Sequence, residues 1–462
     1  MSIFHIERAD GTSRRVGGYK HKPQPGARQF EASLATEDLP PAVDLRPHLT
    51  PVEDQGDTNS CTANATAGAF EYLLKLHTGQ DLDVSRMFIY FNARKLESDA
   101  IADEGSAIAD SVEGLKKFGV CPEDTWPFDP KHVNKHPPHH AYDEAHKEVV
   151  DELEQVPTDL DQWRHCLAEG RPIIFGMKLF DSFDKARKGK VPMPTDSEKA
   201  RNKHGRHAML CVGYSDVDRL FIVRNSWGGT WGDRGYCYIP YDYLMNDEYN
   251  SGDSWVIRHV DGVAEPDRST WGDDTSILPE FDDTELHRMD DDAYQVMLDA
   301  MGSVHLESRV ALLFMVAAGI DGDVSADELA ALNDEVQRML AALGSDLSAH
   351  AVVRFARKHV DDESLIEESV ALLGAHLSNE LLASLLASMR AVAGGDDLGD
   401  EEAEFLDTIT EVWEIDVDDA AEGDGSEEDA DDSDDEDADD SDDEDGDDDD
   451  DDDETDDEDD GS

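Results

Sequence analysis

The chain carries a cysteine, Cys61, at the start of a segment whose apolar residues recur at helical spacing from about Ser60 to His77. A thiol at a helix N-terminus lies at the positive end of the helix dipole, which favours the thiolate and lowers the pKa. Because the thiolate is the nucleophilic form, Cys61 is a candidate nucleophile. The alternative is a small buried side chain, the more common fate of a free cysteine.

Three further polar residues stand in segments that accompany Cys61. Gln55 precedes it by six residues in VEDQGDTNSCTANA, His207 lies in GRHAMLCVGY, and Asn225 lies in VRNSWGGTWGDRGYCYI. The separations are 146 residues from Cys61 to His207 and 18 from His207 to Asn225. In order and spacing, these segments resemble the signature blocks of the papain family of cysteine peptidases. The resemblance covers about residues 38–262.

The resemblance implies a role for each residue. Cys61 would be the nucleophile, and His207 its ion-pair partner and later the general acid for the leaving amine. Asn225 would orient the imidazole. Gln55 would donate its amide N–H to the oxyanion, beside the backbone N–H of Cys61. Trp227 matches the family tryptophan that shields the histidine–asparagine hydrogen bond from water.

The cleft segments depart from the family pattern in places. The family sequence C-G-S-C-W reads Thr58-Asn59-Ser60-Cys61-Thr62, so a disulfide cysteine is absent. The segment that matches the family's Gly-Gly loop, around Gly105, also has no cysteine. Five cysteines in all are few, odd in number and widely spread, so we expect reduced thiols.

Arg206, beside the histidine, matches a specificity-pocket position, and we hypothesise that it favours an acidic P2 residue.

The order of predicted elements indicates an α+β fold. Helical segments come first, and short β-rich runs bounded by turn residues follow residue 170. We therefore expect a papain-like fold with a helical lobe and a β-barrel-like lobe. The expected organisation is a flexible arm (1–37), the peptidase domain (38–262), an acidic linker (263–290), an all-α domain (291–416) and a disordered acidic tail (417–462). The arm is too short for the long helical propeptide of secreted relatives, so we do not expect activation by removal of one.

The all-α segment resembles the tellurite-resistance TerB family, in which a helical bundle carries acidic motifs. Two such motifs, AAGIDGDVSADE and AVAGGDDLGDEE, stand 74 residues apart. The resemblance implies a site for Ca²⁺ or a similar cation with oxygen ligands, namely Asp321, Asp323, Glu328, Asp397 and Glu402. The alternatives are helix capping, since Ser325 to Glu328 form a capping box, and a scaffold that binds a protein partner.

The charge of the chain is strongly negative. It has 39 Lys and Arg against 110 Asp and Glu, a formal net charge of −71, and 32 of the acidic residues follow residue 416. At molar salt the Debye length falls to roughly 3 Å, which removes most of the self-repulsion. We therefore expect a salt-rich cytoplasm. Nucleic acid is not expected as a partner, because phosphate binding needs basic patches. No secretory signal or membrane span is evident.

The predicted function is a cysteine endopeptidase that acts on peptides or proteins through a thioester and needs no cofactor for catalysis. Two alternatives stay open. One is an acyltransferase or amidase with the same catalytic residues, and the other is a catalytically silent adaptor that binds peptides.

Overall fold

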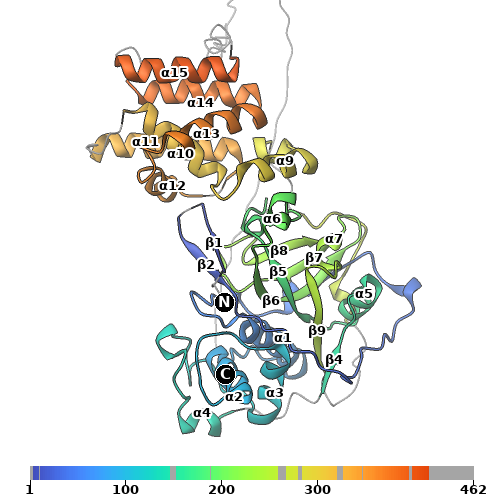
Figure 1. Ribbon diagram of the computed structural model, residues 1–462. Coiled ribbons are helices and arrows are strands. Elements are labelled where there is room, and N and C mark those ends of the chain that lie inside the picture. Colours follow the sequence, from blue (N-terminus) through green and yellow to red (C-terminus); the bar gives the residue numbers. More distant parts are fainter. Residues whose placement is uncertain are drawn as a thin grey trace, which may run out of the picture. The chain divides into compact units, whose positions relative to one another are not determined.

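The computed structural model describes residues 4–9, 11–145, 152–187, 189–258, 267–278, 283–319, 326–345, 347–394 and 398–415. Within these ranges the chain forms a peptidase part, made of a helical lobe and a sheet, and a helical part that follows it (Figure 1). Each part has its own hydrophobic core. The α+β prediction is confirmed.

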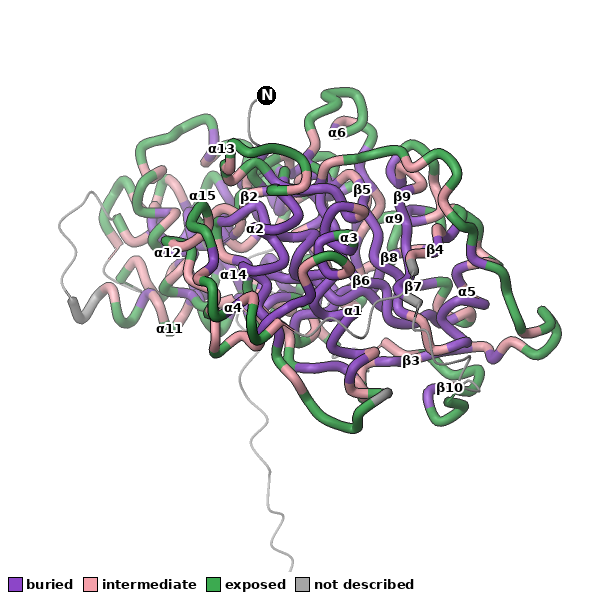
Figure 2. The backbone as a smooth tube through the Cα atoms, turned by 90° about the horizontal axis from the view of Figure 1, so that it is seen from below, coloured by how far each residue is buried: buried purple, intermediate pink, exposed green. Residues whose placement is uncertain are grey.

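The helical lobe contains three helices close to the predicted positions. They are α1 (Cys61–Thr78), α2 (Arg86–Glu97) and α3 (Ile108–Phe118). Helix α1 is followed by Gly79, whose φ of +69° is a left-handed conformation that glycine adopts without strain. Most of α1 is buried, which Figure 2 shows as a purple stretch. Its first residue, Cys61, is therefore fixed on a well-packed element.

An antiparallel eight-stranded sheet forms the second lobe, with the order β10-β3-β6-β5-β9-β4 and with β7 and β8 continuing from β6. The described pairings do not close, so the expected β-barrel-like lobe is an open sheet. Its strands are β3 (Ala42–Asp44), β4 (Glu152–Gln155), β5 (Ile173–Leu179), β6 (Gly205–Ser215), β7 (Leu220–Arg224), β8 (Tyr236–Pro240), β9 (Asn250–Arg258) and β10 (Trp271–Gly272).

Short helices connect these elements. The α-helices are α4 (His139–Asp143), α5 (Leu160–Ala168), α6 (Asp196–Arg201) and α7 (Tyr241–Leu244), and the 3-10 helices are Thr36–Asp38, Arg46–His48, Pro130–His132, Asp181–Asp184 and Arg268–Thr270.

The N-terminal arm differs from the flexible segment expected for residues 1–37. It opens with a hairpin of β1 (Phe4–Glu7) and β2 (Ser13–Val16). Phe4, Ile6 and Val16 are buried in the core of the peptidase part. The polar composition concealed this because only alternate hairpin residues face the core.

The helical part contains α8 (Glu285–Arg288), α9 (Asp291–Met301), α10 (Leu306–Ala317), α11 (Ala326–Leu343), α12 (Ala349–Ala356), α13 (Glu363–His376), α14 (Asn379–Val392) and α15 (Asp400–Trp413). Helix α10 is apolar on nearly every side and contacts five other helices of the bundle. A helix with this pattern belongs in a core.

The segment expected to be an acidic linker, 263–290, is partly structured. Strand β10 pairs with β3 of the peptidase sheet. Leu286 of α8 packs in the core of the helical part, and the Glu285 carboxylate accepts hydrogen bonds from the backbone N–H and the hydroxyl of Ser378. The tail after residue 416 lies outside the described residues.

Among the described helices, none is individually long and apolar enough to cross a membrane, whereas the bent pair α9 and α10 meets the criterion of length and composition.

Candidate active site

Cys61 is the first residue of α1 and is completely buried. Burial raises the pKa of its thiol to about 12, against the opposing effect of the Ala208 backbone N–H. In this conformation the thiol is neutral, although the helix start favours a thiolate. The contact with Ala208 places the sulfur beside the strand that carries His207.

His207 lies on β6 and is also completely buried. Its Nε2 is 2.8 Å from Asn225 Oδ1, and its Nδ1 has no hydrogen-bond partner among the described residues. Asn225 Oδ1 also accepts a hydrogen bond from the Ser226 backbone N–H at 2.8 Å, which identifies it as the acceptor oxygen. Nε2 therefore carries the proton, and the Nδ1 lone pair is left free to take another.

The pairing of β6 with β7 brings His207 and Asn225 together. Leu210 of β6 stands opposite Arg224 of β7, and Asn225 follows directly. Trp227 is 1% exposed, and its ring centroid lies 5.3 Å from that of His207. Its ring therefore covers one side of the imidazole.

Gln55 is held by two segments of the site. Its side-chain Nε2 donates to the Thr58 carbonyl at 2.8 Å, and its Oε1 accepts from the Ser226 hydroxyl at 2.6 Å. An amide nitrogen has two N–H groups, so one is left for an oxyanion. The backbone of Gln55 donates to the Ser226 carbonyl at 2.9 Å, which ties this loop to the segment after Asn225.

The N-terminal arm covers the thiol. A methyl group on Gly18 would lie 2.9 Å from Cys61 Sγ and 2.4 Å from the Asn59 carbonyl oxygen. Only glycine allows the arm to pass this closely. Sequence reasoning did not identify Gly18, although the Gly17-Gly18 pair is a signal for close backbone approach.

Backbone hydrogen bonds fix the arm in the cleft. The Ser106 N–H donates to the Gly18 carbonyl at 3.0 Å, and the Lys20 N–H donates to the Ser106 carbonyl at 3.0 Å. Tyr19 and Ser106 therefore form a parallel β-bridge. Gly105 has a φ of +83°, and a methyl group there would lie 2.2 Å from the Gly18 carbonyl oxygen. Gly105 therefore lies directly against the arm.

Four ion pairs flank this stretch of the arm. They are Arg14–Asp54 at 3.2 Å, Arg15–Asp103 at 3.1 Å, Lys20–Glu97 at 3.0 Å and Lys22–Asp110 at 2.6 Å. The arm is thus a basic segment that lies on an acidic surface. Arg206 also borders the arm, since its carbonyl is 3.5 Å from the Tyr19 backbone nitrogen, and its own side chain is exposed.

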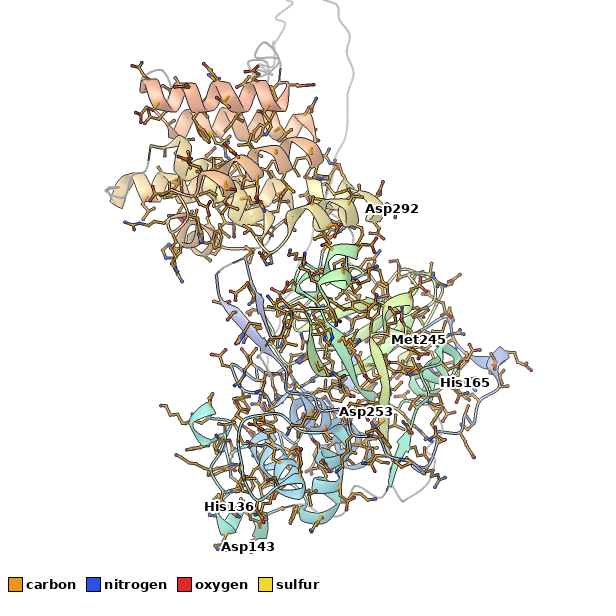
Figure 3. All side chains as sticks on the ribbon, in the orientation of Figure 1. His136, Asp143, His165, Met245, Asp253 and Asp292 are labelled. Carbon is orange, nitrogen blue, oxygen red and sulfur yellow. The ribbon has the colours of Figure 1, made fainter. Side chains whose placement is uncertain are left out.

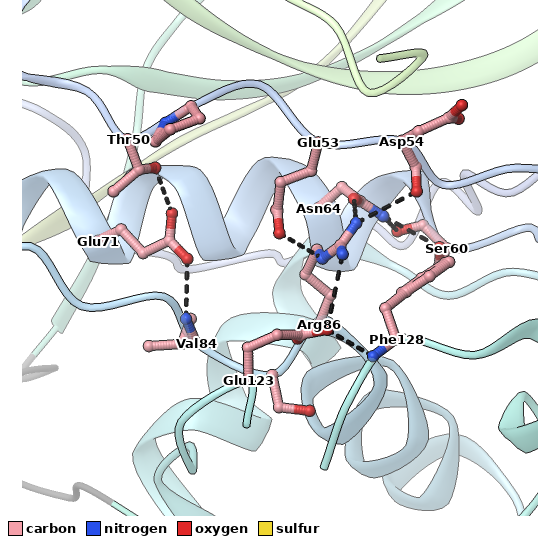
Figure 4. A network of polar contacts seen from close by, with 12 residues as sticks. Thr50, Glu53, Asp54, Ser60, Asn64, Glu71, Val84, Arg86, Glu123 and Phe128 are labelled. Carbon is pink, nitrogen blue, oxygen red and sulfur yellow. Dashed lines mark hydrogen bonds and ion pairs between the residues drawn. The ribbon is translucent and has the colours of Figure 1, made fainter. Parts of the chain in front are cut away.

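A polar network lies beside the start of α1 (Figure 4). Arg86 forms an ion pair with Glu53 at 2.6 Å and donates to Asn64 Oδ1 at 3.1 Å. Asn64 in turn donates to the Ser60 carbonyl at 3.0 Å. Burial raises the pKa of Glu53 to about 8 in spite of Arg86. The network fixes Ser60, and therefore the turn that presents Cys61.

All five cysteines are free and buried.

The predicted cation ligands of the helical part are mostly outside the described residues. This holds for Asp321, Asp323 and Asp397, and for the side chain of Glu328. The carboxylate of Glu402 lies beside both Gly319 and Gly399, where added methyl groups would approach its oxygens to 2.4 and 2.1 Å. The flanks of the two acidic motifs therefore meet. Among the described residues, no three His, Cys, Asp or Glu side chains gather as a metal site.

Known proteins share the peptidase part. A family model described as papain family cysteine protease matches residues 39–250. An uncharacterized peptidase C1-like protein of Acanthamoeba polyphaga mimivirus is 38% identical over 235 residues, which are 48% of this chain and 74% of that protein. The chain belongs to the papain family of cysteine proteases. Its peptidase part is therefore a hydrolase of the cysteine protease class.

Two further proteins each match about half of the chain. Pro-cathepsin H of Bos taurus is 28% identical over 211 residues, 44% of this chain and 61% of that protein. The solved structure of xylellain, a cysteine protease from Xylella fastidiosa, is 36% identical, with a TM-score of 0.48 and coverage of 53% of this chain and 97% of that chain.

Proposed function

We propose that the chain is a cysteine endopeptidase whose nucleophile is Cys61. The observation that carries the proposal is the His207 Nε2···Asn225 Oδ1 hydrogen bond of 2.8 Å, which leaves Nδ1 unpartnered on the strand beside the thiol. With the cleft open to water, Nδ1 takes the thiol proton and the thiolate attacks the peptide carbonyl. Histidine then returns the proton to the leaving amine, and a thioester forms.

Hydrolysis of the thioester completes the reaction. His207 takes a proton from water, the hydroxide adds to the thioester carbonyl, and the carbon–sulfur bond breaks to release the carboxylic acid and the thiol. In both steps the negative oxygen accepts hydrogen bonds from the backbone N–H of Cys61 and the remaining side-chain N–H of Gln55. Each donor of this kind typically contributes about 2.7–4 kcal/mol.

The described conformation is a resting form of this enzyme. Gly18 lies against the sulfur, and no substrate carbonyl fits between them. The buried, neutral Cys61 and His207 agree with a site kept dry by the arm. Displacement of residues 17–20 is therefore the first step of activity.

Reaction with an epoxysuccinyl inhibitor, which alkylates an activated thiolate, tests the proposal in molar KCl. We expect labelling of the wild type and of Gly18→Val, faster in the variant because the valine side chain cannot fit against Asn59. Cys61→Ala is the control and should not be labelled. Labelling of Cys61→Ala would assign the chemistry to another cysteine. Labelling of neither wild type nor Gly18→Val would favour the adaptor hypothesis.

We further propose that the helical part is a TerB-like domain that binds a divalent cation where its two acidic motifs meet. Gly319 and Gly399 stand 80 residues apart in the sequence, and both lie beside the Glu402 carboxylate, which supports this proposal. Calorimetric titration of Ca²⁺ into the full chain and into Glu402→Gln tests it. Heat in the wild type and a weaker affinity in the variant are expected, and no heat beyond dilution would refute it.

The charge of −71 supports a salt-rich cytoplasm as the working environment. In dilute buffer we expect the protein to lose its reactivity with the epoxysuccinyl inhibitor rapidly, and we expect molar KCl to restore it.

A further inference from the structure

The turn that carries Cys61 is joined to the loop before Gly105 by the residue Asp103. Its Oδ1 accepts a hydrogen bond from the Asn59 backbone N–H at 2.9 Å, and the Asn59 side-chain amide donates to the Asp103 carbonyl at 2.7 Å. Asn59 stands two residues before Cys61. All five cysteines of the chain are free, so no disulfide joins these two segments, and the hydrogen bonds of Asp103 take that part.

Tyr90 of α2 fixes the position of the Asp103 carboxylate. Its hydroxyl donates to Asp103 Oδ1 at 2.7 Å and accepts a hydrogen bond from the Gly105 backbone N–H at 3.0 Å. The helical lobe, in which side chains fill the space between the helices (Figure 3), buries Tyr90 completely. Arg94 Cζ lies 3.7 Å from the centroid of the Tyr90 ring, and the Arg94 guanidinium donates to the Ala102 carbonyl at 2.7 Å. The loop is therefore attached to the packed interior of the lobe.

The second oxygen of Asp103 faces the arm. Arg15 of the arm forms an ion pair with Asp103 Oδ2 at 3.1 Å, and the Asp103 side chain is 16% exposed. The two oxygens of one carboxylate thus have different partners, because Oδ1 bonds groups that stay in the enzyme and Oδ2 bonds a group that leaves with the arm. Burial raises the pKa of the Cys61 thiol, and the charge of Asp103 raises it further, which places the carboxylate near the nucleophile.

We propose that Asp103 is a positioning residue for the reaction, because its Oδ1 holds the turn in which the backbone N–H of Cys61 points at the oxyanion. The inference rests on the proposed function and adds to it a residue that acts through the turn. Asn59 is 4% exposed, so without the carboxylate its backbone N–H would lose its acceptor where little water reaches. The turn would then shift, and a misplacement of about 1 Å at a reacting group can cost about 10²-fold in rate.

The ratio of two reactions of Cys61 tests this role. Hydrolysis of a fluorogenic peptide, measured as kcat/KM, needs the oxyanion donors, whereas alkylation by iodoacetamide needs only the thiolate. The fraction of molecules with a displaced arm and the fraction with a thiolate enter both rates, so they cancel in the ratio of hydrolysis to alkylation. We expect this ratio to be about 10 to 100 times lower in Asp103→Ala than in the wild type.

Two matched variants separate the turn from the arm. Asp103→Asn keeps an acceptor oxygen for Asn59 and Tyr90 and removes the charge that binds Arg15, and Arg15→Ala removes only the ion pair. Both should have the wild-type ratio, although each separate rate rises because the arm is held less tightly. A wild-type ratio in Asp103→Ala, or a ratio in Asp103→Asn as low as in Asp103→Ala, would overturn the inference. The wild type would still hydrolyse the peptide, so the proposed function would stand.

A second measurement does not depend on the chemistry. In the Cys61→Ala chain, hydrogen–deuterium exchange of the Asn59 amide should be equally slow with and without Asp103→Asn. It should be about tenfold faster with Asp103→Ala, the factor expected for one lost hydrogen bond. Tyr90→Phe keeps the buried ring and removes the hydroxyl that orients Oδ1, so exchange should also be faster there, by a smaller factor. Unchanged exchange in Asp103→Ala and Tyr90→Phe would show that Asp103 does not hold the turn, whether or not the enzyme hydrolyses peptides.

Discussion

Gln55 contributes to the site through its side-chain N–H groups, because its side-chain oxygen already accepts a hydrogen bond. Its Oε1 accepts from Ser226, and its Nε2 donates to Thr58. Gln55→Glu keeps the shape and the acceptor and removes both N–H donors. We expect kcat to fall by about 10²–10³ with little change in KM, the effect of losing an oxyanion donor. Steady-state hydrolysis of a fluorogenic peptide measures it, and unchanged kcat would exclude Gln55 from this role.

His207 makes the closed conformation sensitive to acid. Burial lowers its pKa to about 4, against the opposing effect of Asn225. The neutral imidazole therefore contributes stability that is fully present above the unfolded pKa of about 6.5 and is lost as the pH falls toward 4. The shift corresponds to about 3 kcal/mol. Cys61 affects the free energy of unfolding at alkaline pH. Because burial raises its pKa, the thiol contributes stability that is fully present below the unfolded pKa of about 8.5 and is lost progressively as the pH rises above it.

Urea unfolding of the full chain at pH 7.5, 6, 5 and 4 measures this effect, with His207→Gln as the control that keeps a side-chain donor for Asn225 and does not titrate. The wild type should lose more free energy of unfolding than the control between pH 6.5 and 4. Parallel losses in the two proteins would contradict the prediction.

At the scale of elements, the arm is held by charges that salt can screen. Four ion pairs, from Arg14–Asp54 to Lys22–Asp110, are all at least partly exposed. Exposed pairs contribute about 0–1 kcal/mol each, and the Debye length falls from about 10 Å at 0.1 M to about 3 Å at 1 M salt. We therefore expect iodoacetamide to react with Cys61 about two- to tenfold faster at 1 M than at 0.1 M KCl.

Gly18→Val is the control for this experiment, since its arm is already displaced by the clash with Asn59. Its rate should be nearly independent of KCl. A wild-type rate that does not rise would mean that Tyr19 and the backbone hydrogen bonds alone hold the arm.

The elements that could be predicted from the sequence are those with local signals. Helix α1 follows from its apolar spacing and Gly79, and β6 from the run around His207. The arm could not be predicted, because Gly18 and Tyr19 have partners nearly 90 residues away at Ser106.

At the scale of the whole molecule, the negative charge extends over the structured part as well as the tail. Of the 110 acidic residues, 78 precede residue 417, against all 39 Lys and Arg. Self-repulsion at low salt should therefore destabilise the structured part by itself. The midpoint of thermal unfolding should rise between 0.1 and 2 M KCl both in the full chain and in a chain that ends at residue 416. A rise confined to the full chain would locate the repulsion in the tail.

The arm is continuous with the enzyme that it covers, and it is attached on both sides of the cleft. Upstream, the apolar side chains of the hairpin are buried in the core, and downstream the Phe30 N–H donates to the Gln155 carbonyl at 2.8 Å. The arm therefore acts on the cleft at an effective concentration that is set by its attachment to the same chain, and dilution cannot lower this concentration. A single cut on either side would leave the covering segment tethered through the other, and only cuts on both sides would turn it into a free peptide that dilution removes.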